Sequence, residues 1–495
     1  MTAQSLEERR AEDLETRRHA QREFQRPLVV EAGAGTGKTA TLVSRIVAWC
    51  LGPGWQRALD ERPEATPGRL AARVLEGVVA ITFTEAAAAE MAERVESMLR
   101  SFEFDEASAN VELPASLPAE EVRRRAQALR GSVDHLVVQT IHAWCRRLLS
   151  AHPVEAGLPP RFEVDADGRR YRGVVRELLE ERLRDAYAQP GGSPLLDLAV
   201  AGVGPGELEE ALLGLLASGV DAEDFKSDPL SPERIGGEMR LLVERVEAFA
   251  ESGIAAFHAG KNVRRAQALL DATEALRAGL ARVPADLDAL AELLDLLSGH
   301  FGEKELERLK DFAREKFTKS EAKALADAEA RVVQSAGPLH ELLSNWAGLD
   351  ARLLSAQHAA LAPLLSEVQT RARLRGFCSY EQLLGGCARL LSENPGVAAQ
   401  VRGELDQLLV DEFQDTDKRQ CEIVAALALA KPPEERPGLF VVGDPKQSIY
   451  GWRRADLAAY EAFVARVVDA GGELRRLCVN HRSVPAVLEE VERSV

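Results

Sequence analysis

Residues 27–39 read PLVVEAGAGTGKT, an apolar run that leads into a glycine-rich turn and ends in Gly37-Lys38-Thr39, where a helical pattern begins. Glycines allow such a turn to adopt unusual dihedral angles and to point its N–H groups at phosphate oxygens. The N-terminus of the following helix adds partial positive charge toward the same anion. This order of strand, turn and helix predicts a phosphate-binding loop.

The expected ligand of this loop is ATP with Mg²⁺. Lys38 is expected to reach the β- and γ-phosphates, and the Thr39 hydroxyl is expected to bind Mg²⁺. Ala32 departs from the simple pattern, which has glycine there. A glycine-rich turn with an unrelated lysine is the alternative, and it leaves the flanking strand and helix unexplained. The residues expected to surround the phosphates are Ala32, Gly33, Ala34, Gly35, Thr36, Gly37, Lys38 and Thr39.

A second polar cluster follows the apolar run at residues 407–410, with Asp411 and Glu412 directly after it. Ligands of α/β folds bind at the carboxyl ends of the strands. We therefore expect Asp411 to hold Mg²⁺ through water and Glu412 to act as the base for an attacking water, which implies hydrolysis. The alternative is that these acids cap the following helix, a role that suits Asp415 or Thr416 better.

Short apolar runs alternate with Ala-, Glu- and Arg-rich helical patterns toward both ends of the chain. Such alternation predicts a parallel sheet with crossover helices. Between about residues 153 and 376 the strand signal nearly vanishes, and apolar residues recur at the three- and four-residue spacing of amphipathic helices. Residues 55–69, rich in Pro, Gly and charge, are predicted to form a loop or an insertion between the first helix and the second strand. The predicted strands are residues 28–31, 78–82, 136–139, 407–410, 439–442 and 476–479.

Composition narrows the classes of protein that remain. The 495 residues include 62 Lys and Arg against 79 Asp and Glu, a net charge of −17. This disfavours binding of DNA through a whole basic face. The six cysteines are scattered without metal-ligand spacing, which favours reduced, inert thiols. The polar N-terminus, and the lack of any run near the roughly 18 apolar residues of a membrane helix, predict a cytoplasmic protein without a membrane segment.

Further segments follow in order along the chain. They read ITFTEAA at 81–87, QTIHAW at 139–144, SYEQLL at 379–384, DEFQDT at 411–416, VGDPKQSIYGWR at 442–453 and NHRS at 480–483. With the phosphate-binding loop, they resemble the motifs of the UvrD/Rep-type superfamily 1 DNA helicases, and most of all the RecB/AddA-like branch with long insertions. The chain departs from that pattern in the altered acids of residues 379–384 and in His481, where Phe or Tyr is usual.

This resemblance implies roles for residues of the later motifs. Gln447 is placed to sense the γ-phosphate, and Arg482 resembles the arginine that reaches it, so that the expected catalytic set is Glu412, Lys38, Gln447 and Arg482. Aromatic side chains offer a platform on which bases of single-stranded DNA stack, and stacking does not need a basic surface. A place in the core is the alternative for Trp452, His142 and Trp144. The residues expected to contact DNA are Phe83, Thr84, Thr140, His142, Tyr450, Trp452 and Arg453.

The resemblance also implies a domain organisation. A P-loop RecA-like domain, 1A, is expected at residues 1–152 and 377–470, interrupted by the helical insertion 1B at 153–376. A second RecA-like domain, 2A, is expected to begin at 471–495. Because nothing resembles motifs V and VI, the chain is expected to be the N-terminal half of such a protein. Gln21 lies 17 residues before Lys38, but Arg17 or Arg18 could equally occupy the place of the family's adenine-reading glutamine.

The function implied is that of an ATP-dependent DNA helicase, moving 3′ to 5′ by resemblance, in repair or recombination. Its expected partners are single-stranded DNA or a duplex with a single-stranded tail, and a second subunit of the RecBCD/AddAB type. The alternative is a non-catalytic module that binds ATP and single-stranded DNA and regulates or completes a partner chain. An ATPase that acts on something other than DNA is disfavoured by Tyr450, Trp452 and Arg453 together.

Overall fold

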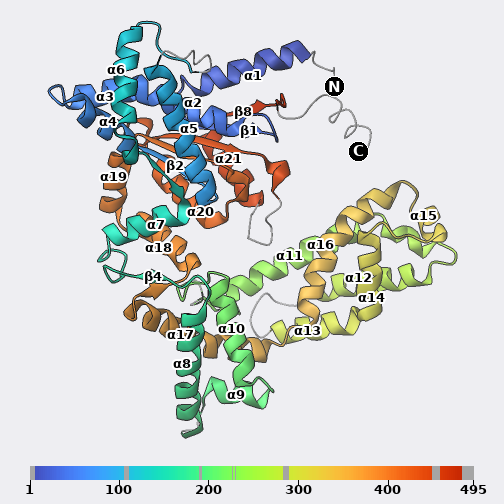
Figure 1. Cartoon of the computed structure of the whole chain (residues 1–495). Coiled ribbons are helices and arrows are strands. Elements are labelled where there is room, and N and C mark those ends of the chain that lie inside the picture. The colour runs from blue at the N-terminus through green and yellow to red at the C-terminus, as the bar shows by residue number, and fades with distance from the viewer. Residues whose placement is uncertain are drawn as a thin grey trace. The chain divides into compact units, whose positions relative to one another are not determined.

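The computed structural model describes residues 6–104, 111–188, 192–223, 225, 227–228, 230–281, 289–448 and 457–481. The chain divides into two compact units (Figure 1). The first is drawn from both ends of the chain, up to Ala166 and from Arg373 onward, and the second runs from Asp167 to Ala372.

The first unit is built on a parallel sheet of six strands, in the order β3-β2-β6-β7-β1-β8. The predicted α/β class with a parallel sheet is confirmed. All the carboxyl ends of these strands meet at one edge because the strands are parallel. The strands are β1 (Leu28–Ala32), β2 (Val78–Thr82), β3 (Val137–Thr140), β6 (Gln407–Val410), β7 (Gly438–Gly443) and β8 (Glu473–Leu477).

Helices cover both faces of the sheet, because alternate strand residues point to opposite sides. Val29, Val79 and Leu408 pack into one apolar core with α7 and α18–α21, whereas Leu28 and Val78 pack into a second core with α2–α6. The helices of this unit are α1 (Leu6–Ala20), α2 (Lys38–Leu51), α3 (Pro53–Glu61), α4 (Pro67–Glu76), α5 (Glu85–Glu103), α6 (Ala119–Arg130), α7 (Ile141–Ala151), α18 (Tyr380–Glu393), α19 (Pro395–Glu404), α20 (Lys418–Ala428) and α21 (Leu457–Asp469).

Short elements complete the first unit. The parallel pair β4 (Glu163–Val164) and β5 (Phe377–Cys378) brings together the two places where the chain leaves and re-enters this unit. The 3₁₀ turns are η1 (Val133–His135), η5 (Phe413–Asp415), η6 (Pro433–Glu435) and η7 (Pro445–Gln447).

Two expectations differ from the structure. Residues 55–69 are an insertion between α2 and β2 rather than a loop, because Pro53 and Pro67 open helices α3 and α4, and Trp55 is buried. Proline is well tolerated in the first helical turn, where no backbone N–H is required. The last strand, β8, pairs with β1 in this sheet and begins three residues before the predicted run at 476–479. The domain boundary expected at residue 471 stays a prediction.

The second unit is helical throughout its described residues. Apolar side chains of α11–α16 form its core, with Phe249, Phe257, Leu309 and Phe312 at most 1% exposed. Its elements are α8 (Arg169–Ala188), α9 (Pro194–Val200), α10 (Pro205–Ala217), α11 (Pro232–Ala250), η3 (Ile254–His258), α12 (Arg264–Leu280), α13 (Ala289–His300), α14 (Glu303–Ala313), α15 (Lys319–Leu325), η4 (Ala326–Ala328), α16 (Glu329–Ala347) and α17 (Ala351–Leu374).

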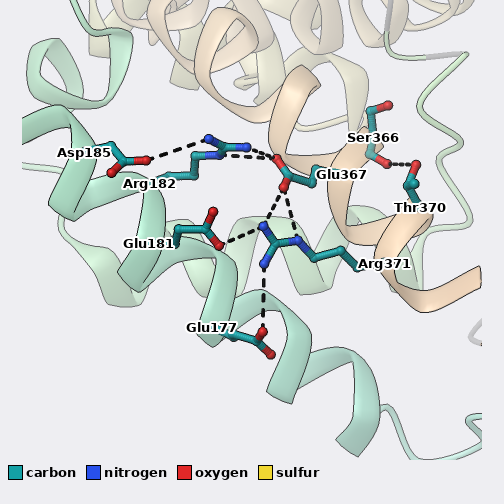
Figure 2. Close-up of polar contacts among 8 residues, drawn as sticks. All are labelled: Glu177, Glu181, Arg182, Asp185, Ser366, Glu367, Thr370 and Arg371. Atoms are coloured by element: carbon teal, nitrogen blue, oxygen red, sulfur yellow. Dashed lines mark hydrogen bonds and ion pairs between the residues drawn. The ribbon is translucent and has the colours of Figure 1, made fainter. Parts of the chain in front are cut away.

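Charged side chains link α8 and α17, the first and last helices of this unit (Figure 2). Glu367 on α17 accepts hydrogen bonds from Arg182 on α8, at 2.5 Å, and from Arg371 on its own helix, at 2.6 Å. Arg371 also donates to Glu181 on α8, at 2.8 Å. Partial burial raises the pKa of Glu367, but the hydrogen bonds from Arg182 and Arg371 outweigh it and hold that pKa below its usual value. The network therefore depends on a charged Glu367.

Candidate functional site

The phosphate-binding loop, residues 33–39, connects β1 to α2 as predicted. Gly35 and Gly37 have φ angles of 75° and 83°, in the left-handed region that favours glycine. Thr36 closes the turn, since its hydroxyl donates to the carbonyl oxygen of Gly33 at 2.8 Å. No described side chain caps the N-terminus of α2. The first N–H groups of that helix are therefore left for an anion.

Lys38 and Glu412 are brought together from opposite ends of the sequence, 374 residues apart. The Lys38 Nζ donates to Glu412 Oε2 at 2.6 Å. Glu412 follows β6 and has a φ of 50°, a conformation uncommon for residues other than glycine. Strained residues of this kind cluster at functional sites. The fold thus places the lysine predicted to bind phosphate beside the carboxylate predicted to activate water.

Gln414, which the sequence analysis did not single out, links the two segments that follow β6 and β7. Its side chain is buried, and its Nε2 donates to Glu412 Oε2 at 2.8 Å. Its Oε1 accepts the backbone N–H of Asp444 at 2.8 Å. A Cβ on Gly443 would lie 2.7 Å from that Oε1, so only glycine allows this approach. In the sequence, Gln414 stands between the acids Glu412 and Asp415, directly after a predicted buried strand. An amide in that place is the signal that could have identified it.

Gln447 lies in η7 after β7, at the same edge of the sheet. Its Nε2 donates to Asp444 Oδ2 at 2.5 Å. That Oδ2 would be 3.8 Å from a Cβ on Gly33, so the Asp444 carboxylate lies against the phosphate-binding loop. Gln447 is therefore connected to the loop through Asp444. Its predicted contact with the γ-phosphate remains a prediction.

The acids after β6 are suited to a divalent cation. Asp411 is 9% exposed, and burial, followed by the charge of Glu412, raises the pKa of Asp411 to about 6. Burial and Glu412 likewise raise the pKa of Asp415 to about 6, and its buried Oδ1 has no hydrogen-bond partner among the described residues. Mg²⁺ is commonly held by one or two carboxylates together with substrate phosphates. The unpartnered, buried Oδ1 of Asp415, close to Asp411 in the sequence, fits such an ion.

The three candidates for the adenine-reading position occupy different surroundings. Gln21 is buried, and its Oε1 accepts the backbone N–H of Glu112 at 2.7 Å. Arg18 forms an ion pair with Glu112 at 3.0 Å. Arg17 instead contacts α2, since its Nη1 donates to the Thr41 hydroxyl at 2.9 Å. Of the three side chains, Arg17 is the one bonded to residues beside the phosphate-binding loop.

Four of the residues predicted to contact DNA lie at the carboxyl ends of β2 and β3. They are Phe83, Thr84, Thr140 and His142. Thr84 and Thr140 cap α5 and α7 through their hydroxyls, and Thr140 also donates to Glu85 Oε1 at 2.8 Å. Phe83 is partly buried. Trp144 is 2% exposed, which places it in the core, as the alternative held.

His142 lies one residue into α7 and packs edge-on against the ring of Tyr380, with 5.1 Å between ring centroids. Burial lowers the pKa of His142 below its usual value. Tyr380 is 44% exposed at the start of α18. The remaining predicted site residues, Tyr450, Trp452, Arg453 and Arg482, lie outside the described residues.

The family model named UvrD/REP helicase N-terminal domain matches residues 14–467. The chain belongs to this family. It is 28% identical to an ATP-dependent helicase/nuclease subunit of Geobacillus kaustophilus (strain HTA426), over 94% of the chain and 38% of that protein. The corresponding subunit of Desulforudis audaxviator (strain MP104C) is 30% identical, over the same two shares. The "RecBCD enzyme subunit RecB" of Escherichia coli (strain K12) is 25% identical, over 94% of the chain and 37% of the relative.

These relatives confirm the resemblance to the RecB/AddA-like branch. The chain spans less than two fifths of the length of each of the three. Among the described residues, no helix combines the length and the apolar character needed to cross a membrane.

Proposed function

We propose that this chain provides the ATP-hydrolysing domain of a DNA helicase of the UvrD/RecB type, which moves 3′ to 5′ and serves DNA repair or recombination. The observation that carries the proposal is the 2.6 Å contact between Lys38 and Glu412, because it joins a phosphate-binding lysine and a candidate base. The family and the names of the relatives give the reaction class.

In this proposal the phosphate-binding loop and Lys38 bind and orient the triphosphate of ATP. Thr39 and Asp411 hold Mg²⁺, which neutralises charge on the phosphates when it is bound. Glu412 accepts a proton from the attacking water, while Gln414 keeps its carboxylate in place. Gln447 and Arg482 are proposed to contact the γ-phosphate.

Single-stranded DNA is proposed to bind along the carboxyl ends of β2 and β3. Thr84 follows β2, and the exposed Tyr380 packs against His142, which follows β3. Base stacking on aromatic side chains tolerates any sequence, which suits a translocating enzyme. The proposed stacking residues Tyr450 and Trp452, together with Arg453, follow β7 in the sequence.

We further propose that residues 153–376 form domain 1B. We also propose a partner subunit of the RecBCD/AddAB type and, as the substrate, duplex DNA that carries a single-stranded tail.

The test is nucleotide binding and hydrolysis by the 495-residue chain, with and without a single-stranded oligonucleotide. We expect Lys38→Ala to abolish binding of fluorescent ATP, because the main cationic contact to the phosphates is lost. Lys431→Ala is the matched control, since Lys431 is exposed. Equal ATP binding by Lys38→Ala and the unaltered chain would contradict the proposal. Binding without any turnover, with or without DNA, fits an N-terminal half that needs its second RecA-like domain, whereas a function that is unchanged in Glu412→Gln, with ATP still bound, would favour the non-catalytic module instead.

A further inference from the structure

Helix α1 binds the segment that follows β8, residues 478–481, which we call the exit segment. Asp13 on α1 is 4% exposed. One of its carboxylate oxygens accepts the backbone N–H of Cys478 at 2.9 Å, and the other accepts that of Val479 at 3.0 Å. A buried carboxylate with both oxygens committed to main-chain N–H groups fixes the direction in which the chain leaves the sheet.

The same helix binds the phosphate-binding loop one turn later. Arg17 lies 3.9 Å from Asp13. Its Nη1 donates to the Thr41 hydroxyl at 2.9 Å, and its Nη2 donates to the carbonyl oxygen of Thr36. The two residues form a continuous charged connection from the loop to the exit segment, which we call the Asp13–Arg17 bridge.

The exit segment also contacts the loop directly. The backbone N–H of His481 donates to the carbonyl oxygen of Gly35 at 2.8 Å. Two consecutive carbonyl groups of the loop, those of Gly35 and Thr36, are therefore held from outside, the first by the exit segment and the second by Arg17.

The planarity of the peptide unit gives these contacts a consequence for nucleotide binding. A carbonyl group and the N–H of the next residue belong to one rigid plane and point in opposite directions. The carbonyls of Gly35 and Thr36 share their planes with the N–H groups of Thr36 and Gly37. The Thr36 N–H donates to the carbonyl oxygen of Gly33 at 3.3 Å within the turn, whereas the Gly37 N–H belongs to the part of the loop that is expected to turn toward phosphate. Any rotation of these two planes on phosphate binding must act on His481 and Arg17.

We propose that Asp13 and Arg17 are positioning residues which tie the exit segment to the phosphate-binding loop, so that nucleotide bound at the loop restrains the chain where it leaves β8. This inference rests on the nucleotide site of the proposed function. Coupling of this kind is reciprocal, so that releasing the exit segment weakens nucleotide binding by the same factor.

Cys478 provides a native reporter of the exit segment. It is exposed, and the five other cysteines are buried. The experiment measures the rate at which N-ethylmaleimide modifies Cys478 in the full chain, with and without Mg²⁺ and a non-hydrolysable ATP analogue. We expect the analogue to slow modification about five-fold, at the lower end of typical coupling between sites.

Asp13→Asn should remove this effect. Asparagine keeps one acceptor oxygen but turns an NH₂ donor toward the second backbone N–H. We expect faster modification without nucleotide, a change of less than about two-fold on adding it, and affinity for the analogue weaker by about five-fold. Glu12→Gln, which removes the same charge from an exposed position of α1, should behave like the unaltered chain. Arg17→Lys keeps the charge but cannot donate to Thr41 and Thr36 at the same time, as the guanidinium does. This variant replaces Asp13→Asn in the test if Asp13→Asn does not fold.

The outcomes separate this inference from the function on which it rests. If the unaltered chain binds the analogue but Cys478 reacts at an unchanged rate, the coupling is wrong and the nucleotide site stands. The same holds if Asp13→Asn and Arg17→Lys keep the full nucleotide effect. If the unaltered chain does not bind the analogue at all, the proposed function fails, and this inference fails with it.

Discussion

Lys38 and Glu412 bind each other at 2.6 Å, although the proposed function assigns them to different parts of ATP. Phosphate oxygens must compete with the Glu412 carboxylate for the lysine. We therefore expect Glu412→Gln to bind ATP about three- to ten-fold more tightly, because a partly exposed ion pair contributes about 1 kcal/mol. Hydrolysis should fall by about 10²- to 10⁴-fold, the usual contribution of a general base.

This expectation is measured by titration with fluorescent ATP and by single-turnover hydrolysis. Glu422→Gln is the control, since Glu422 is an exposed glutamate on α20. Unchanged ATP affinity in Glu412→Gln would show that the ion pair does not oppose phosphate binding. Unchanged hydrolysis would remove Glu412 from the role of base.

The raised pKa of Asp411, about 6, predicts a pH dependence for Mg²⁺. Above pH 6 the carboxylate is charged and able to hold the ion, whereas below pH 6 it is neutral. Mg²⁺-dependent binding of ATP should therefore weaken as the pH falls from 7 to 5, by up to about ten-fold per pH unit below the pKa. Titrations with and without Mg²⁺ in the unaltered chain and in Asp411→Asn isolate this effect from protonation of ATP. An equal pH dependence in both chains would contradict it.

Single residues of the site were predictable to different degrees. The phosphate-binding loop and the acids after β6 follow from local pattern, because strand, turn and carboxylate are adjacent in sequence. Gln414 was not predicted, and Arg17 was one of three equal candidates for the adenine-reading position, because the contacts of both depend on segments far away in the sequence. Arg17 touches Thr36 and Thr41, whereas Gln21, equally placed by counting, turns into the fold toward residue 112.

The contacts between α8 and α17 allow the contribution of a charged side chain to stability to be measured. Glu367 is the acid shared by Arg182 and Arg371 (Figure 2). We expect Glu367→Gln to lower the free energy of unfolding of the second unit by about 1 kcal/mol, and the difference to shrink in 1 M salt, where exposed charges are screened. Urea unfolding at low and high salt measures both. Glu341→Gln, an exposed position on α16, is the control, and an equal loss in both variants would exclude the network as its cause.

Helices and strands were predicted best where a short apolar run in the sequence coincides with a buried element of the structure. Strands β2 and β6 have the predicted limits, because each is a short buried run bounded by polar residues. Helices α3 and α4 were missed because their prolines and glycines suggest a loop. Burial of Trp55 and Leu70 outweighs that local signal. The last strand was predicted at residues 476–479 but lies at Glu473–Leu477, because Glu473 and Arg475 interrupt the apolar pattern at its start.

For the molecule as a whole, the second unit should fold by itself. Its helices α11–α16 enclose their own apolar core. We expect residues 167–372, produced alone, to be helical by circular dichroism and to unfold in one cooperative transition in urea. A chain that is largely unfolded, or that loses its helix gradually, would show that the core needs the first unit.

The order of the strands could not be predicted from the sequence. Which parallel strands become neighbours depends on long-range contacts that local pattern does not encode. β1 and β2 follow one another in the chain, yet β6 and β7 lie between them in the sheet. The site depends on this order, because it brings Glu412 beside Lys38.

That order also constrains how the protein is made on the ribosome. β1 finds its partners, β7 and β8, only after the second unit has been synthesised. At about 5–20 residues per second, residues 167–372 alone take about 10–40 s to translate. During this interval β1 has neither of its strand partners, although β2, β3 and helices α2–α6 have been made. The nascent N-terminal segment is therefore a natural client for chaperones that shield unpaired strands until the last strands emerge.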